Sequence, residues 1–138
     1  MIFILGVNTG CPGHYQTADD FPGVRYYGRG YIQLSWAYNY KNASLALFND
    51  LRLYMHPNLV AESDDISWAV SFWYWKAHVH NKPGISEGHF GVSTNAINGF
   101  LECNGGLYQQ KAPLRFNLYK NVLKAFSIND KPIEDGCY

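Results

Sequence analysis

The sequence predicts a mainly α-helical domain with a minor β element. Four stretches repeat apolar residues at every third or fourth position, which is the spacing of an α-helix. Strand signals are weak, and the best short candidate is 24–32. The 138 residues contain no repeat, low-complexity tract or interdomain linker. We therefore expect a single domain over residues 1–138.

The first predicted helix spans 34–48. Ser35, Asn39 and Asn42 recur at helical spacing, so they predict an uncharged polar face. Ser35 also stands where an N-cap residue would stand. The segment thus allows two interpretations, a polar binding face or an ordinary capped helix whose aromatic residues belong to the core.

The second predicted helix spans 65–78, with Asp64 or Asp65 as its N-cap. Apolar side chains occupy nearly its whole circumference, and three large aromatic residues, Trp68, Phe72 and Trp75, share one side. A helix that is apolar all round is usually enclosed by the rest of the fold. We therefore expect this helix to be buried at the centre of the domain.

The third and fourth helices are predicted at 92–102 and 112–126. Five apolar residues of the fourth are expected to face inward: Leu114, Leu118, Val122, Leu123 and Phe126. Arg115 falls inside this apolar arc, and a buried guanidinium requires a carboxylate partner. Glu102, on the polar face of the third helix, is the natural candidate. The pair could be a structural ion pair or part of a catalytic network, and both interpretations predict contact.

Composition excludes several classes of function. Eleven acidic and eleven basic residues balance, so no basic surface suggests nucleic acid. No apolar run approaches the roughly 20 residues that cross a membrane. His78 and His80 are a poor pair of metal ligands without further donors. We expect a monomer with no cofactor, no metal, no nucleic-acid partner and no membrane span.

The segment 26–40 is the most informative part of the chain. It contains five tyrosines, one tryptophan and two glycines, together with the neutral polar residues Gln33, Ser35 and Asn39. Aromatic faces stack on the apolar faces of pyranose rings, and amides and hydroxyls bind sugar hydroxyls. This composition favours a neutral polysaccharide as ligand. A glycine turn followed by an aromatic core helix is the alternative.

Several motifs in order resemble those of family 19 glycoside hydrolases, the plant-type chitinases. The matching segments are 26–30, 32–35, 39–40, 72–75, 82–83, 91–99, 102–103, 115–116, 119–120 and 136–138. Residues 22–138 match well, whereas 1–21 match poorly. The resemblance implies a lysozyme-like helical fold, and it places this chain in the C-terminal part of an N-terminally shortened domain.

The resemblance also implies roles for individual residues. Ser35 matches a serine that helps to hold the attacking water. Glu102 and Arg115 match a network that tunes and orients the catalytic acid. Five residues match contacts to N-acetylglucosamine units or their acetamides: Gln33, Tyr38, Asn39, Lys82 and Asn98. The implied partner is therefore chitin or N-acetylglucosamine oligomers.

The family reaction inverts the anomeric carbon with a general acid and a general base. Both family glutamates lie upstream of the Gly-Arg-Gly loop, but this chain has no glutamate before Glu62, and Gly6 aligns with the base. Asp19 and Asp20 are expected to be turn residues. Three functions remain open: an endochitinase that cleaves β-1,4-linked N-acetylglucosamine in chitin or cell-wall catabolism, a non-catalytic chitin-binding protein, and a lysozyme-like peptidoglycan hydrolase.

The chain has three cysteines. By the resemblance, Cys103 and Cys137 pair, whereas no partner for Cys11 is visible. A disulfide favours a secreted, extracellular protein. Three reduced thiols in a cytosolic protein are the alternative.

Overall fold

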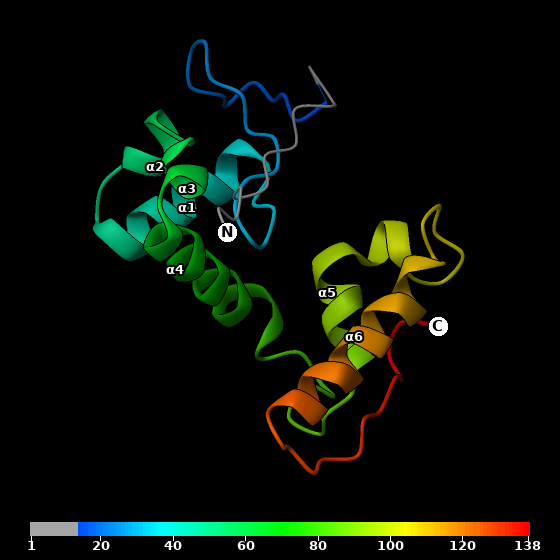
Figure 1. Ribbon diagram of the computed structural model, residues 1–138. Coiled ribbons are helices and arrows are strands. Elements are labelled where there is room, and N and C mark those ends of the chain that lie inside the picture. Colours follow the sequence, from blue (N-terminus) through cyan, green and yellow to red (C-terminus); the bar gives the residue numbers. More distant parts are fainter. Residues whose placement is uncertain (1–13) are drawn as a thin grey trace. The chain divides into compact units, whose positions relative to one another are not determined.

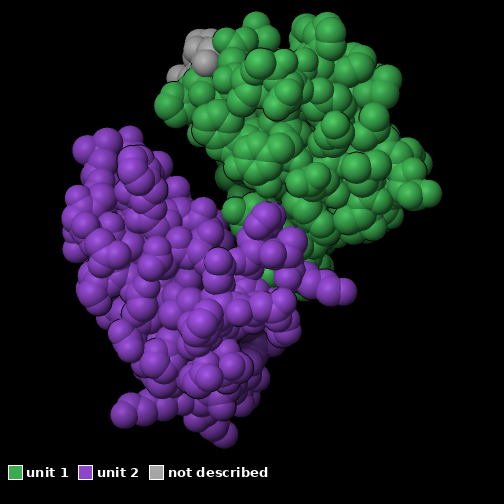
Figure 2. Space-filling view, turned by 180° about the vertical axis from the view of Figure 1, so that it is seen from behind, with its two compact units in different colours: residues 1–75 green, residues 76–138 purple. Residues whose placement is uncertain are grey.

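The computed structural model describes residues 14–138 (Figure 1). It divides into two compact units, residues 1–75 and 76–138, shown in green and purple in Figure 2. We describe each unit by itself. The expectations for Gly6 and Cys11 lie outside the described residues, and the single domain over 1–138 stays a prediction.

The described residues are mostly helical, as predicted. The elements in order are α1 (Ala37–Phe48), α2 (Arg52–Met55), α3 (Leu59–Glu62), α4 (Asp64–Tyr74), the π-helix η1 (Trp75–Val79), α5 (Phe90–Glu102) and α6 (Lys111–Ala125). Between residues 14 and 138 the isolated β-bridges are Arg29–Leu34 and His89–Ile133. The predicted strand at 24–32 is therefore wrong, because that segment pairs only through one bridge across a tight loop. None of these helices is long and apolar enough to cross a membrane.

Buried tyrosines form the centre of the first unit. Tyr26 and Tyr40 are fully buried, together with Leu34, Leu53, Val60 and Val70. The Tyr26 hydroxyl donates a hydrogen bond to the Tyr54 carbonyl oxygen (2.6 Å), and the two rings stack with centroids 5.5 Å apart. Burial raises the pKa of Tyr26 to about 12. Part of the aromatic segment 26–40 thus belongs to the core. The hydroxyl groups of its buried tyrosines, Tyr26 and Tyr40, donate hydrogen bonds to backbone carbonyl oxygens.

Helix α4 differs from the prediction in its cap and in its exposure. Ser63, rather than Asp64 or Asp65, is the N-cap, and its hydroxyl accepts a hydrogen bond from the Ile66 amide. Trp68 and Phe72 of α4 are exposed, and so is Trp75 at the start of η1. The expected burial all round is wrong because the helix buries only the narrow face that carries Ser67 and Val70.

Replacing Ser63 with alanine is expected to lower the free energy of unfolding by about 1 kcal/mol, because the first turn of α4 loses its side-chain cap. Urea denaturation followed by circular dichroism measures the change. Asp65→Ala is the matched control, since it removes a residue that lies inside the first turn and does not cap. A larger loss for Asp65→Ala than for Ser63→Ala would contradict the assignment of the cap.

Helices α5 and α6 pack together in the second unit. The Phe90 ring, at the start of α5, stacks on the Tyr119 ring of α6 with centroids 4.6 Å apart. The C-terminal coil packs so closely on α5 that a Cβ atom on Gly91 would lie 2.2 Å from the Glu134 carbonyl oxygen. Glycine is required at this position because the two backbones touch.

The inward face of α6 is not the predicted one. Ala112, Phe116, Tyr119 and Leu123 recur at helical spacing, and all are buried or half-buried. Leu123 is the one residue of the predicted set that is buried, whereas Leu114, Leu118, Val122 and Phe126 are exposed. The expectation that these four residues face inward is wrong, because Phe116 and Tyr119 turn the opposite side of the helix towards Phe90.

Candidate sugar-binding and carboxylate sites

A tight loop holds the residues that precede α1. The backbone amides and carbonyls of Arg29 and Leu34 pair in both directions (3.2 and 3.0 Å), and the Gln33 amide donates to the Gly30 carbonyl oxygen (3.2 Å). Gln33 and Trp36 have positive φ angles of 54° and 72°. Non-glycine residues with such angles concentrate at functional sites, where surrounding contacts hold the strained backbone in place.

The arginine between the two glycines anchors this loop. Arg29 is 3% exposed. Its Nη1 donates to the carbonyl oxygens of Arg25 and Tyr27 and to the Tyr40 hydroxyl, and its Nε donates to Asn58 Oδ1 (3.0 Å). The guanidinium lies 3.8 Å from the centroid of the Tyr27 ring. Sequence reasoning missed this role. The sequence offered one signal for it, which is a cationic residue between two glycines in a segment rich in tyrosine.

Gln33 and Ser35 are fixed by bonds within the loop. The Gln33 side chain is exposed, and its Nε2 donates to the Gly30 carbonyl oxygen (3.0 Å). Ser35 Oγ donates to the Gln33 carbonyl oxygen (2.9 Å). Ser35 is not the N-cap of α1, because Trp36 occupies that position without a side-chain cap. The interpretation of Ser35 as a helix cap is therefore wrong.

Tyr38 and Asn39 lie in the first turn of α1. Tyr38 is 56% exposed, whereas Asn39 is 6% exposed. Asn39 Nδ2 donates to the Ser35 carbonyl oxygen (2.9 Å), and among the described residues its buried Oδ1 has no hydrogen-bond partner. Asn42 is exposed but Asn39 is buried, and Ser35 precedes α1, so Ser35, Asn39 and Asn42 do not form the solvated polar helix face that was predicted. The first unit thus brings Gln33, Ser35, Tyr38 and Asn39 together at one loop and helix start.

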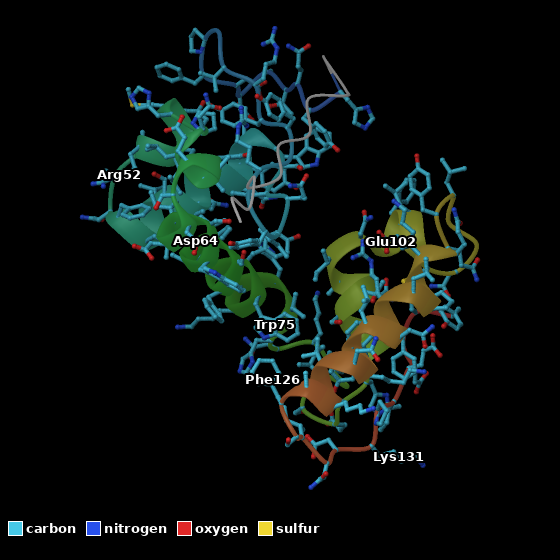
Figure 3. All side chains as sticks on the ribbon, in the orientation of Figure 1. Arg52, Asp64, Trp75, Glu102, Phe126 and Lys131 are labelled. Carbon is cyan, nitrogen blue, oxygen red and sulfur yellow. A yellow bond between two sulfur atoms is a disulfide. The ribbon has the colours of Figure 1, made fainter. Side chains whose placement is uncertain are left out.

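A buried carboxylate marks the second unit. Glu102 lies at the end of α5 (Figure 3). Its side chain is 1% exposed. Its two oxygens accept from Arg115 Nε (2.5 Å) and Nη2 (2.7 Å), and Oε1 also accepts from Asn98 Nδ2 (2.8 Å). Hydrogen bonds from Arg115 lower the pKa of Glu102, and the Asn98 amide adds to this against the opposing effect of burial. The predicted contact between Glu102 and Arg115 is present.

The environment of Arg115 differs from the prediction. Its side chain is 50% exposed, so the buried member of the pair is the carboxylate and not the guanidinium. Asn98 interrupts α5 with φ −147° and ψ 31°, at a kink one turn before Glu102. The kinked backbone and the carboxylate together set the position of the Asn98 amide.

The remaining predicted site residues lie in the same unit. Lys82 is exposed in the turn that follows η1. The disulfide implied by the resemblance is present between Cys103 and Cys137. The second unit therefore holds Lys82, Asn98, Glu102 and Arg115. The roles that the resemblance implies for these residues stay predictions.

Comparison with known proteins identifies the family of the chain. The family model described as chitinase class I, of glycoside hydrolase family 19, matches residues 7–88. The chain belongs to the family 19 glycoside hydrolases. This membership agrees with the motifs that run from the Gly-Arg-Gly loop towards the C-terminus.

Curated family 19 relatives come from several plants. Chitinase 4 of Oryza sativa subsp. japonica is 40% identical over 113 residues, covering 78% of this chain and 36% of that protein. Inactive chitinase-like protein 1 of Hevea brasiliensis is 37% identical over 125 residues, covering 78% of this chain and 39% of that protein. The chain therefore spans little more than a third of the length of these relatives.

Solved family 19 structures share the fold. The class IV chitinase from Zea mays matches with a TM-score of 0.77 and 31% identity, over 91% of this chain and 61% of that one. Chitinase C from Streptomyces griseus matches with a TM-score of 0.72 and 34% identity, over 88% of this chain and 62% of that one. The predicted lysozyme-like, mainly helical fold is confirmed.

Proposed function

We propose that this chain binds chitin oligosaccharides through the neutral side chains around the Gln33 loop. The observation that carries the proposal is the first turn of α1, where an exposed phenol, Tyr38, stands beside a loop whose amide and hydroxyl are already held by internal bonds. Such preorganised groups lose little conformational freedom when a sugar binds. A phenol face suits the apolar face of a pyranose, and the amide suits an acetamide or hydroxyl.

The second unit supplies the other proposed contacts. In this proposal Lys82 and Asn98 bind further N-acetylglucosamine units, while Glu102 and Arg115 act as positioning residues. The contacts support this division, because Glu102 holds the Asn98 amide at 2.8 Å and is itself covered by protein. A carboxylate whose oxygens are occupied by Arg115 and Asn98 is poorly placed to transfer a proton.

Hydrolysis requires groups that these 138 residues do not supply at the family positions. An inverting glycosidase needs two carboxyl groups roughly 6.5–9.5 Å apart, with a water molecule between one of them and the sugar. The chain has no glutamate before Glu62. We therefore propose that it binds chitin without cleaving it by itself. In this proposal, Ser35 can position an attacking water molecule only where a general acid and a general base are also present.

An endochitinase acting in chitin or cell-wall catabolism is the second candidate. Its support is the similarity to proteins named as endochitinases, such as acidic endochitinase SP2 of Beta vulgaris, at 40% identity over 107 residues. Colloidal chitin separates the two candidates. Sedimentation of the protein with the polymer and no soluble product is expected, whereas release of oligosaccharides would overturn the binding-only function.

Replacing Tyr38 with alanine is expected to weaken binding of N-acetylglucosamine oligomers about tenfold, because one stacking face is lost. Isothermal titration calorimetry measures the dissociation constant. Tyr108→Ala is the matched control, since Tyr108 is also exposed but lies outside the proposed site. Equal affinities of the wild type and Tyr38→Ala, or no binding by the wild type, would contradict the proposed site.

We further propose that the protein is secreted and monomeric. The disulfide between Cys103 and Cys137 supports an oxidising, extracellular location, because such bonds are rare in the cytosol.

A further inference from the structure

A pocket of the first unit lies apart from the proposed sugar contacts. Its lining residues fall between 23 and 29 and between 55 and 62, a stretch that includes α3, and its volume is about 560 Å³. The lining does not include Gln33, Ser35, Tyr38 or Asn39. Protein pockets that bind small organic molecules usually enclose roughly 300–1,000 Å³. This pocket is therefore large enough for an organic ligand.

A buried cation lines this pocket. Arg29 is 3% exposed, and its hydrogen bonds to residues 14–138 all go to neutral acceptors, which are two carbonyl oxygens, the Tyr40 hydroxyl and the Asn58 amide oxygen. These bonds use Nε and Nη1, whereas Nη2 has no hydrogen-bond partner among the same residues. Residues 1–13 contain no aspartate or glutamate that could pair with it.

This arrangement differs from that of the other buried charge. Glu102 is paired with Arg115, as buried charges normally are. Arg29 forms no ion pair within residues 14–138. An anionic oxygen that accepted from Nη2 would make a charge-assisted hydrogen bond and would neutralise the buried guanidinium. The pocket at Arg29 thus favours an anionic ligand.

The charges of the lining indicate how many negative charges the ligand carries. Arg25 is a second lining cation, and its guanidinium contacts neutral groups, the Val24 carbonyl oxygen (3.3 Å) and the Gln16 side-chain amide. Glu62 is the one acidic residue of the lining, and it is exposed. With His56 neutral, the lining therefore carries one net positive charge. A singly charged anion fits this lining better than a doubly charged phosphate, because Glu62 opposes the second negative charge.

Apolar surface completes the pocket. Four apolar residues contribute to its lining: Val24, Met55, Pro57 and Leu59. The Tyr27 ring also lines it, with its centroid 3.8 Å from the Arg29 guanidinium. We propose that the pocket binds a small organic monocarboxylate, with its carboxylate on Arg29 and Arg25 and its apolar body against these side chains. This site is separate from the proposed chitin contacts.

Isothermal titration calorimetry of the full chain with 3-phenylpropionate tests the proposal. The dissociation constant is expected to be about 1 mM or lower, and the neutral 3-phenylpropanamide and inorganic phosphate are expected to bind at least about tenfold more weakly. Arg25→Gln is expected to weaken binding of the carboxylate at least about fivefold, and Glu62→Gln is expected to strengthen it. Arg52→Gln is the matched control, because Arg52 is an exposed arginine outside the pocket, and it is expected to leave the affinity unchanged.

Arg29→Gln tests the buried cation directly, with circular dichroism to establish that the variant folds. The folded variant is expected to lose binding of the carboxylate; if it does not fold, Arg25→Gln and Glu62→Gln decide. Equal affinities for the carboxylate and the amide, tighter binding of phosphate, or no binding of the carboxylate at about 10 mM would overturn the proposal. Unchanged affinity in both Arg25→Gln and Glu62→Gln would overturn it as well. Binding of N-acetylglucosamine oligomers by Arg25→Gln is expected to equal that of the wild type, so the two proposals fail separately.

Discussion

Replacing Cys137 with serine is expected to lower the free energy of unfolding by about 3 to 4 kcal/mol, because the disulfide no longer restricts the unfolded chain. The bridge joins residues 34 positions apart and ties the end of α5 to the C-terminus. Both cysteines are buried, and the Asn104 amide donates to the Cys137 carbonyl oxygen beside the bridge. Urea denaturation of the oxidised protein and of the variant measures the difference.

Reduction provides the control for this expectation. A reducing agent is expected to destabilise the wild type to the level of Cys137→Ser and to leave that variant unchanged, because the variant has no bridge to lose. Equal stability of the oxidised and reduced wild type would show that the bridge does not restrict the unfolded chain.

Replacing Arg115 with alanine is expected to lower the free energy of unfolding by about 3 kcal/mol at neutral pH, because it leaves a buried carboxylate without its cation. Glu102 is 1% exposed, and after the substitution the Asn98 amide is its remaining hydrogen-bond donor among the described side chains. Binding of N-acetylglucosamine oligomers is expected to fall as well, since Glu102 orients Asn98.

Arg52→Ala is the matched control. Arg52 and Asp50 also form a close ion pair, at 2.7 Å, but their side chains are 50% and 41% exposed. An exposed pair contributes at most about 1 kcal/mol, because water solvates both charges in its absence. If Arg52→Ala and Arg115→Ala lowered the free energy of unfolding by similar amounts, burial of Glu102 would not be the reason for the effect of Arg115→Ala.

The effect of Arg115→Ala is expected to depend on pH in a definite direction. Arg115 lowers the pKa of Glu102 below the ordinary value of 4.5. A lowered pKa contributes stability that is fully present above the unfolded-state value and is lost as pH falls through the folded-state value. The wild type and Arg115→Ala should therefore differ most near neutral pH and converge in acid. A constant difference across this range would assign the effect to packing instead.

Local sequence patterns predicted where the long helices form, but they did not reveal the single-turn helices α2 and α3. Helical spacing located each long helix between residues 14 and 138, because periodic apolar residues indicate which positions must leave water. The boundaries were less accurate. Helix α1 begins at Ala37 and not at residue 34, since Trp36 adopts a positive φ that no periodicity reveals. The pairing of Glu102 with Arg115 followed from a charge at an apolar position, and the family motifs supplied the disulfide.

Which side of each helix is buried depended on contacts between distant residues. The pattern on α6 contains two apolar faces, and stacking on Phe90 selects the one that carries Phe116 and Tyr119. The role of Arg29 likewise depends on Tyr40 and Asn58, which reach it only in the folded chain. Sequence spacing records the geometry of one helix or loop. The burial of a face depends on which neighbour covers it, and that neighbour comes from elsewhere in the chain.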